Sequence, residues 1–126
     1  MSVLVDSSVW VEYFRDEEQA DDRIEGLITE GLIATNELIL AELIPPLIFR
    51  KHTKLASLLC AVPKLPLNIN WAGLIEDQVR CIRHGINKVG IPDLIIAQNA
   101  KSHGVALFTR DKHFQLMAKH VGLELF

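Results

Sequence analysis

The sequence predicts an α/β fold in which helices flank a central parallel sheet. Short apolar runs alternate with segments of helical periodicity along the whole chain, and no linker, repeat or low-complexity tract interrupts them. Strands separated by helices form βαβ units with right-handed crossovers, which makes the sheet parallel. A length of 126 residues and short loops leave room for one domain, over residues 1–126.

The first part of the chain predicts two strands and three helices. Ser7 or Ser8 can cap one helix and Asn36 another, because their side chains accept hydrogen bonds from free backbone amides. Gly31 stops the helix that lies between them. In order, the expected elements are a strand at 2–5, a helix with Val9, Trp10, Tyr13 and Phe14 at helical spacing, a helix at 23–30, a strand at 32–35 and the helix after Asn36.

The Pro45-Pro46 pair is predicted to end or kink that last helix, because neither proline can donate a helical hydrogen bond. Pro46 is then expected to open a further helix through Cys60. The remaining expected elements are a strand at 65–69, a helix at 71–83 capped by Asn70, a helix from Pro92 to Ser102, an apolar strand at 105–108, a helix at 112–120 and a small edge strand at 123–125.

Charge is divided unevenly along the chain. Residues 1–49 hold eleven Asp and Glu against two Arg, a balance of −9, whereas residues 50–126 hold eleven Lys and Arg against five Asp and Glu, a balance of +6; together these give the net charge of −3. The second segment could therefore supply a surface that attracts phosphate despite the acidic total. The alternative is that these charges only keep the surface solvated.

The sequence indicates a cytoplasmic protein with no membrane partner. The longest apolar stretch, 38–49, is broken by Glu42 and two prolines and is shorter than the ~20 residues that a membrane span needs. The first ten residues become too polar after Val5 for a signal peptide. The two cysteines form no C-x-x-C pair, so we expect reduced thiols.

Four acidic residues stand at places where an α/β sheet builds a site. Asp6 follows the first strand and Asp111 comes shortly after the strand at 105–108, so both are expected beside the carboxyl ends of strands. Glu42 lies two turns into an otherwise apolar helix, where a carboxylate is costly unless it is paired or bound to a metal. Asp93 stands at the start of a helix.

Each acid taken alone has a structural explanation. Asp6 could cap a helix, Asp93 could interact with a helix dipole, Asp111 could sit in a turn and Glu42 could face solvent. Taken together, the four predict a shared site, and carboxylates at one place repel one another and need cations. A set of hard oxygen ligands favours Mg²⁺ or Mn²⁺ over Zn²⁺.

Four segments resemble the signature segments of PIN-domain nucleases and, more narrowly, of the VapC toxins of prokaryotic toxin–antitoxin pairs: VLVDSSVWVEYFR, TNELILAEL, GIPDLIIAQNA and LFTRDKHF. They follow the family's order and cover almost the whole chain. The resemblance implies a PIN fold with strand order 3-2-1-4-5 and a short edge strand 5. It also implies Mg²⁺- or Mn²⁺-dependent endoribonuclease activity, a homodimer and inhibition by a cognate antitoxin protein. The Pro45-Pro46 pair is not part of the family's pattern.

The resemblance assigns roles position by position. The residues that match the family's catalytic, metal-binding quartet are Asp6, Glu42, Asp93 and Asp111. Ser8 and Thr109 match the hydroxyl residues beside the first and last acid, and are expected to orient carboxylates or metal-bound waters. Basic side chains of the second half could hold the RNA backbone, although each also fits a solvated surface role: Arg83, Lys88, Arg110 and Lys112. An apolar helix face near 9–14 or 47–59 is expected to bind the antitoxin.

Two other functional classes stay open. A phosphoryl-transfer domain of the receiver type would need an aspartate ending the strand at 65–69, and a phosphatase-like site would need one where Ser8 stands; the sequence has neither. The other alternative is a non-catalytic PIN-like module that binds RNA or a partner protein. The complete acidic quartet argues against this module.

Overall fold

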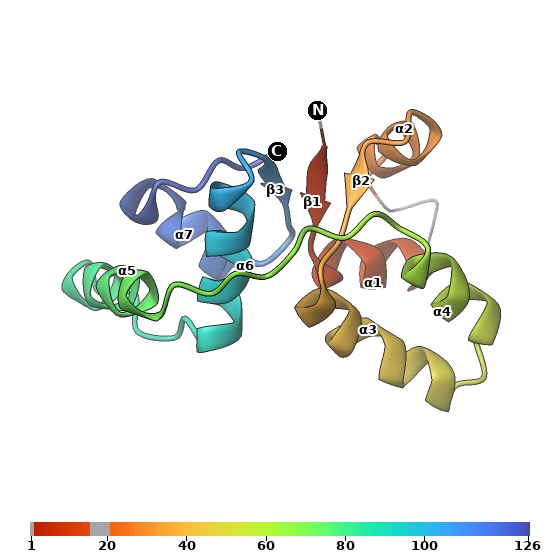
Figure 1. Cartoon of the computed structure of the whole chain (residues 1–126), viewed down its shortest axis with the longest axis horizontal. Helices are drawn as coiled ribbons and strands as arrows, with labels where there is room; N and C mark the ends of the chain where they lie inside the picture. Colours follow the sequence, from red (N-terminus) through yellow and green to blue (C-terminus); the bar gives the residue numbers. More distant parts are fainter. Residues whose placement is uncertain (1, 16–20) are drawn as a thin grey trace.

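A computed structural model describes residues 2–15 and 21–126 of the chain (Figure 1). Three parallel strands form the sheet in the order β2-β1-β3: β1 (Val3–Val5), β2 (Ile33–Ala34) and β3 (Ala106–Phe108). All three residues of β1 are buried, as expected for a central strand covered on both faces. The prediction of a parallel α/β sheet is confirmed, whereas the prediction of five strands in the order 3-2-1-4-5 is wrong in their number, since the described residues form three.

The two outer strands expected at 65–69 and 123–125 are reduced to single bridges. Thr35 pairs with Lys64 beside β2, and Leu107 pairs with Leu125 beside β3. The ladder next to β2 stops because Pro66 has no N–H to donate, and because Asn36 already starts the next helix. The chain after Lys64 is therefore extended, but it has no strand to continue pairing with.

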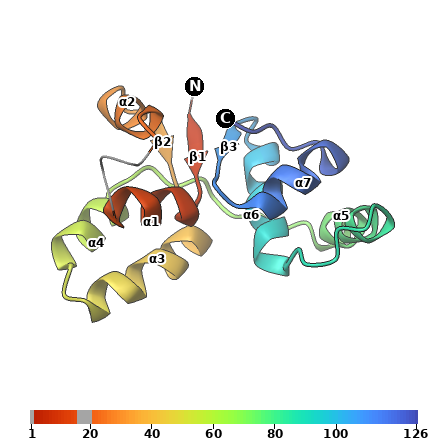
Figure 2. The ribbon, with the colours of Figure 1, turned by 180° about the vertical axis from the view of Figure 1, so that it is seen from behind.

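The helices lie in two groups on opposite sides of the strands, as both ribbon views show (Figures 1 and 2). One group contains α1 (Ser7–Arg15), α2 (Arg23–Thr29), α3 (Glu37–Phe49) and α4 (Thr53–Cys60). The other contains α5 (Trp71–Arg83), α6 (Ile91–Ser102) and α7 (Lys112–Val121). The β1 and β3 strands therefore bring chain segments from both groups to their carboxyl ends.

Helix α3 runs through both prolines and ends at Phe49. The prediction that the helix ends at Pro45-Pro46 is therefore wrong. The two rings are exposed, and the carbonyl groups left without helical donors belong to Ala41 and Glu42, which are exposed as well. Water can satisfy those carbonyls, while the opposite face of the helix keeps Leu43 in the core. The next helix, α4, begins only after a break at 50–52 and not at Pro46.

Most helix starts agree with the sequence. Asn36 and Asn70 accept hydrogen bonds from the amides of Ile39 (2.8 Å) and Gly73 (3.1 Å), as capping residues do. Pro92 occupies the first turn of α6. Both cysteines are free thiols. Among the helices of the described residues, none is long and apolar enough to cross a membrane.

Candidate active site

Asp6 lies directly after β1, where the neighbouring strand holds its backbone. Its amide donates to the carbonyl of Phe108 at the end of β3 (2.9 Å), and its side chain is only 4% exposed. One carboxylate oxygen, Oδ2, accepts from the hydroxyls of Ser8 (2.7 Å) and Thr109 (2.9 Å). A buried carboxylate needs such donors, and here they fix its orientation at the carboxyl ends of the two strands.

The same two hydroxyls hold the chain that follows β3. Thr109 Oγ1 accepts from the amide of Asp111 (3.0 Å), and Ser8 Oγ accepts from the amide of Arg110 (3.0 Å). Each hydroxyl therefore donates to Asp6 and accepts from a backbone amide of the next loop. This arrangement supports the expectation from the resemblance that Ser8 and Thr109 orient carboxylates.

Asp111 caps helix α7. Its Oδ1 accepts from the amide of His113 (2.9 Å) and lies 3.1 Å from Nδ1 of the same histidine. Asp111 therefore has a local structural role, as considered from the sequence, and this role is compatible with membership of a shared site. The interaction leaves Oδ2 without a hydrogen-bond partner among the described residues.

Glu42 and Asp93 come from opposite helix groups, and the charges of nearby carboxylates act on the pKa of both. Glu42 is exposed, but the surrounding protein removes part of its hydration and so raises its pKa, and the charges of Asp6 and Asp93 raise it further. Burial is also the largest cause of a raised pKa at Asp93, and Asp111 and Asp6 add to it. The Gly90 amide and His113 act in the opposite direction on Asp93. The four predicted acids are thus close enough to interact electrostatically.

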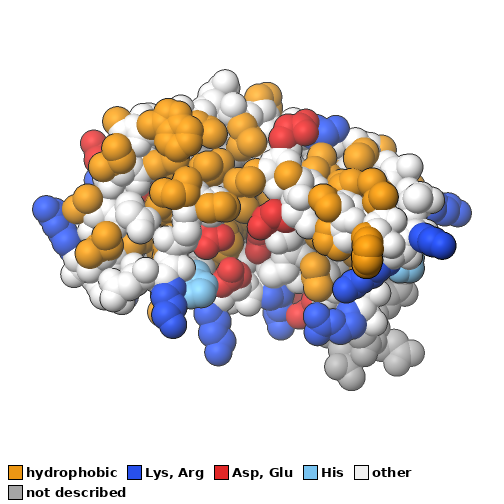
Figure 3. Space-filling view, turned by 90° about the horizontal axis from the view of Figure 1, so that it is seen from below, with side chains coloured by type: hydrophobic (Ala, Val, Ile, Leu, Met, Phe, Trp, Pro, Cys, Tyr) orange, Lys and Arg blue, Asp and Glu red, His pale blue; other side chains and the backbone are white. Residues whose placement is uncertain are grey.

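Figure 3 views the end of the molecule at which the strands finish, and acidic side chains gather between the two helix groups there. No Lys or Arg among the described residues forms an ion pair with any member of the quartet. At least one oxygen of each carboxylate lacks a hydrogen-bond partner within the same residues. Uncompensated carboxylates with free oxygens have the donor chemistry that Mg²⁺ or Mn²⁺ requires.

The four carboxylates have the right chemistry for a metal ion, but they do not form a closed set of ligands. Within the described ranges, no three His, Cys, Asp or Glu side chains stand together as a ready-made metal-binding group. Hard cations retain waters readily, so carboxylates at this spacing suit an ion held partly through water bridges. The residues therefore fit a hydrated divalent cation better than a tightly enclosed one.

The basic candidates behave differently from one another. Arg110 Nε donates to Glu12 (3.1 Å) on α1, so its guanidinium is already engaged. Arg83, Lys88 and Lys112 are exposed, and the structure records no ion pair for them among the described residues. Of the four basic candidates, these three can therefore contact a ligand without breaking an ion pair.

Sequence reasoning missed one buried polar pair that supports the site. Asn36 is 0% exposed and donates from Nδ2 to Oδ1 of Asn99 (2.9 Å), which is 4% exposed. Asn99 in turn donates to the carbonyl of Pro66 (2.9 Å). The pair links the start of α3 to α6, the helices that carry Glu42 and Asp93. The signal available in the sequence was Asn99, an amide that follows the apolar run 94–97 and precedes Ala100 on one helix.

The fold and this carboxylate cluster define the class: an α/β domain with an acidic site at the carboxyl ends of parallel strands. A family profile described as PIN domain matches residues 3–120. The chain belongs to the PIN domain family. No curated protein sequence matches it significantly.

Several solved structures have the same fold. VapBC2 from Rickettsia felis bound to a DNA fragment from their promoter is 19% identical with a TM-score of 0.76, covering 100% of this chain and 98% of that chain. DNA-bound VapBC from Salmonella typhimurium is 16% identical with a TM-score of 0.77, covering 100% and 97%. VapBC-1 from nontypeable Haemophilus influenzae is 19% identical with a TM-score of 0.76, again covering 100% and 97%. At these identities the similarity establishes the fold.

Proposed function

We propose that this PIN domain is a Mg²⁺- or Mn²⁺-dependent endoribonuclease that acts in the cytoplasm as the toxin of a toxin–antitoxin pair. The observation that carries the proposal is the gathering of four carboxylates at one end of the sheet, where the charges of Asp6 and Asp93 raise the pKa of Glu42 and those of Asp111 and Asp6 raise the pKa of Asp93. Carboxylates held this close together without a Lys or Arg partner among the described residues are typical of a cation site. RNA enters as the substrate through the resemblance to VapC toxins.

The chain's own residues would divide the work by position. Asp6, held by Ser8 and Thr109, presents its free Oδ1 in one fixed orientation. Asp111 is fixed by His113 and presents Oδ2. A bound divalent cation would supply charge neutralisation at the phosphodiester and a water of lowered pKa. Because Glu42 is exposed, it lies where substrate enters and can bind a water from the solvent side.

The test is an assay of purified, antitoxin-free chain on total RNA with Mg²⁺ or Mn²⁺. The variants are Asp6→Asn and Asp93→Asn, and Glu25→Gln on the exposed side of α2 removes a carboxylate as a control. We expect wild type and control to cleave, and both aspartate variants to lose cleavage. Cleavage that persists in EDTA, or equal activity in all four proteins, would sink the proposal. RNA binding without cleavage would instead indicate a non-catalytic module.

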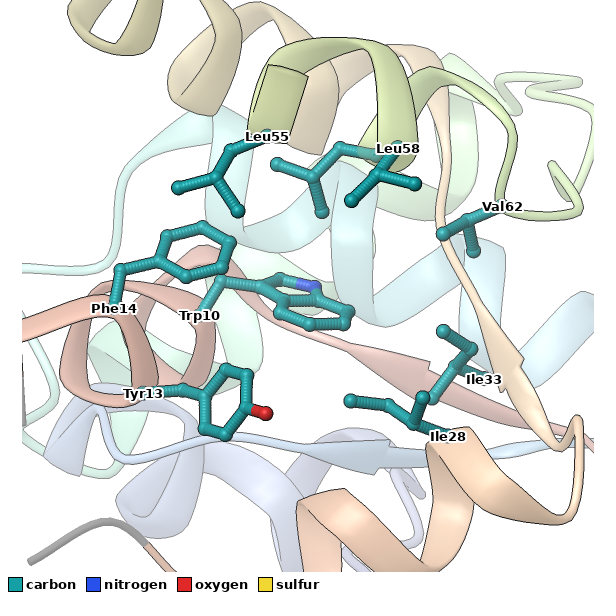
Figure 4. A pocket seen from close by; sticks show the side chains of 9 residues that line it. Trp10, Tyr13, Phe14, Ile28, Ile33, Leu55, Leu58 and Val62 are labelled. Carbon is teal, nitrogen blue, oxygen red and sulfur yellow. The ribbon is translucent and has the colours of Figure 1, made fainter. Parts of the chain in front are cut away.

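We further propose that the antitoxin occupies an apolar groove between α1, α2 and α4. The groove is a hollow of about 540 Å³ lined by Trp10, Tyr13, Phe14, Ile28, Ile33, Leu55, Leu58, Leu59 and Val62. Figure 4 shows the Trp10 ring across its middle, between Leu55 and Leu58 on one side and Tyr13 and Ile28 on the other. The groove combines both stretches, near 9–14 and 47–59, that the sequence suggested separately.

One polar atom in this groove favours a peptide occupant. Trp10 Nε1 is buried without a hydrogen-bond partner among the described residues, and an unpaired buried donor costs about 1–3 kcal/mol. A docked segment could supply a carbonyl acceptor together with apolar side chains. The similar solved structures named VapBC, and the resemblance to VapC toxins, support an antitoxin as that partner.

A co-purification experiment tests the groove. Leu58 is 59% exposed, so Leu58→Asp should fold normally while placing a charge in the groove. We expect it to lose the co-expressed antitoxin, while the matched change Leu116→Asp on the exposed face of α7 retains it. Equal retention of the antitoxin by both variants would rule the groove out.

The expected homodimer also stays a proposal, and helix α5 offers a surface for it. Trp71, Ile75 and Ile82 are 61%, 66% and 56% exposed and share one face, since positions i, i+4 and i+11 differ by less than half a turn. Sedimentation velocity should show a dimer for wild type and a monomer for Ile75→Asp. A dimeric Ile75→Asp would place the interface elsewhere.

A further inference from the structure

A second hollow lies beside the carboxylate site. It has a volume of about 380 Å³ and lies between α1, α3 and the start of α4. Glu42, the exposed member of the quartet, lines one part of it, so the hollow and the carboxylate site share a residue. A ligand filling this hollow would therefore contact Glu42.

Basic side chains line the same hollow. Arg15 at the end of α1, Arg50 at the end of α3 and His52 before α4 all contribute to its wall. Among the described residues none of the three has an ion-pair partner. The arginines that form ion pairs within the described residues are elsewhere: Arg23, Arg80 and Arg110 hold carboxylates at distances of 2.7, 3.2 and 3.1 Å. The two arginines around this hollow are available to an external anion.

The acid and the cation are aligned along one helix. Glu42, Pro46 and Arg50 follow one another at intervals of four residues, so they share a face of α3. Eight residues of helix separate Glu42 from Arg50 by about 12 Å along the axis. A chain with repeated negative charges suits this separation, because one phosphate can lie at the proposed cation site while another reaches Arg50.

An apolar floor lies between the charged ends. It is formed by Val11, Phe14, Leu43, Leu47 and Leu55. Single-stranded nucleic acid is bound by this combination of cations for the backbone and apolar or aromatic surface for bases and sugars. An acidic peptide would also satisfy the arginines, so the experiment below separates the two occupants by measuring RNA binding and antitoxin binding of the same variant.

We propose that this hollow is a subsite for single-stranded RNA, holding the nucleotide next to the cleavage position. The inference rests on the proposed function and adds the path that the RNA chain follows beyond the carboxylate site. Arg50, with Arg15, binds a backbone phosphate, and the apolar floor contacts the adjoining ribose or base. The substrate therefore runs along the α1–α3–α4 side of the site, past Arg15 and Arg50, whereas the sequence had suggested other basic residues for this role: Arg83, Lys88, Arg110 and Lys112.

Arg50 is the residue to test, because Asp16, Glu17 and Glu18 follow Arg15 and lie outside the described residues. The probe is a short fluorescein-labelled oligoribonucleotide, and its anisotropy is measured with the full chain in EDTA to prevent cleavage. Wild type is compared with Arg50→Gln, Arg50→Lys and the control Lys119→Gln, which removes an exposed charge from α7.

We expect Arg50→Gln to weaken RNA binding about 3- to 10-fold and to reduce the slope of log affinity against log salt by roughly 0.7, the loss of one single-strand phosphate contact. Arg50→Lys should keep most of that slope, and Lys119→Gln should match wild type. In a cleavage assay, Arg50→Gln should raise KM and change kcat little, because the contact is remote from the reacting bond.

Arg50→Gln and Lys119→Gln with the same affinity and salt slope would overturn the subsite, and so would wild type that binds no RNA. Normal RNA binding combined with loss of the antitoxin complex would assign the hollow to a protein partner and also overturn it. Failure of the proposed nuclease activity is seen separately, as wild type that binds RNA but does not cleave it with metal.

Discussion

Replacing Thr109 by Val tests whether the hydroxyl pair organises the carboxylate site. The substitution keeps the side-chain shape and removes Oγ1, which donates to Asp6 (2.9 Å) and accepts from the Asp111 amide (3.0 Å). Thr109 is 9% exposed and Asp6 is 4% exposed, so water replaces the lost partners poorly. A hydrogen bond to a charged group contributes about 1.5–3 kcal/mol, and the amide about 1 kcal/mol more. We expect unfolding free energy to fall by about 2–4 kcal/mol.

The matched control is Thr109→Ser, which keeps the hydroxyl and loses one methyl group, a cost of about 0.8 kcal/mol. Urea denaturation of the three proteins in metal-free buffer gives the comparison. If the Val variant is as stable as the Ser variant or more stable, the hydroxyl contributes no more than about 0.8 kcal/mol and the reasoning is refuted. RNA cleavage by the same proteins should follow the same order, with Thr109→Val the least active.

Three further predictions concern stability. The pKa of Glu42 is raised in the folded state, so its deprotonation destabilises the fold as pH rises above about 4.3, the ordinary pKa of a glutamate. Glu42→Gln should therefore have a higher melting temperature than wild type at pH 7 in EDTA. The difference in melting temperature should shrink below about pH 4. Pro45→Ala restores a donor for the Ala41 carbonyl in an exposed helix interior, so it should raise unfolding free energy by about 1–3 kcal/mol in urea; a loss would show that the proline is needed. Asp77 is 4% exposed and binds Lys101 at 3.0 Å, so Asp77→Asn should lower unfolding free energy by about 2–3 kcal/mol, and an unchanged urea midpoint would contradict this.

Local signals predicted local structure well. Asn36 and Asn70 were expected as helix caps, and each accepts the hydrogen bond that defines a cap. These features depend on a few neighbouring residues, so the sequence contains all the information they need. Pro92 in the first turn of α6 follows from the same short-range logic.

Features that depend on distant segments were predicted less well. The Pro45-Pro46 pair is locally unfavourable for a helix, but the opposite face of α3 packs into the core and the prolines face water, so packing outweighs the local cost. The expected strand at 65–69 has suitable residues, but no partner strand remains for it once α3 begins at Glu37. Whether a segment forms a strand depends on the length of the neighbouring strand, and that length cannot be read from the segment's own residues.

The candidate site shows the same division. Asp6 and Asp111 could be placed near strand ends by pattern, and the structure puts both there. The engagement of Arg110 by Glu12 could not be predicted, because those residues are 98 positions apart and belong to different elements. The availability of Arg50 beside Glu42 likewise appears only when α3 and α4 are packed together.

The extended segment beside β2 limits how another protein can bind there. Its hydrogen bonds already use the Thr35 amide, which donates to the Pro63 carbonyl (2.9 Å), and the Thr35 carbonyl, which accepts from Leu65 (2.8 Å). On the outer side, Lys64 can offer its backbone groups, but Pro66, the next residue to face that way, has no amide hydrogen. A visiting chain therefore finds few backbone groups with which to extend the sheet at this edge. A partner of the nearby Trp10 groove is then recognised mainly through the shape and chemistry of its side chains, which makes the pairing selective in a way that shared backbone hydrogen bonding is not.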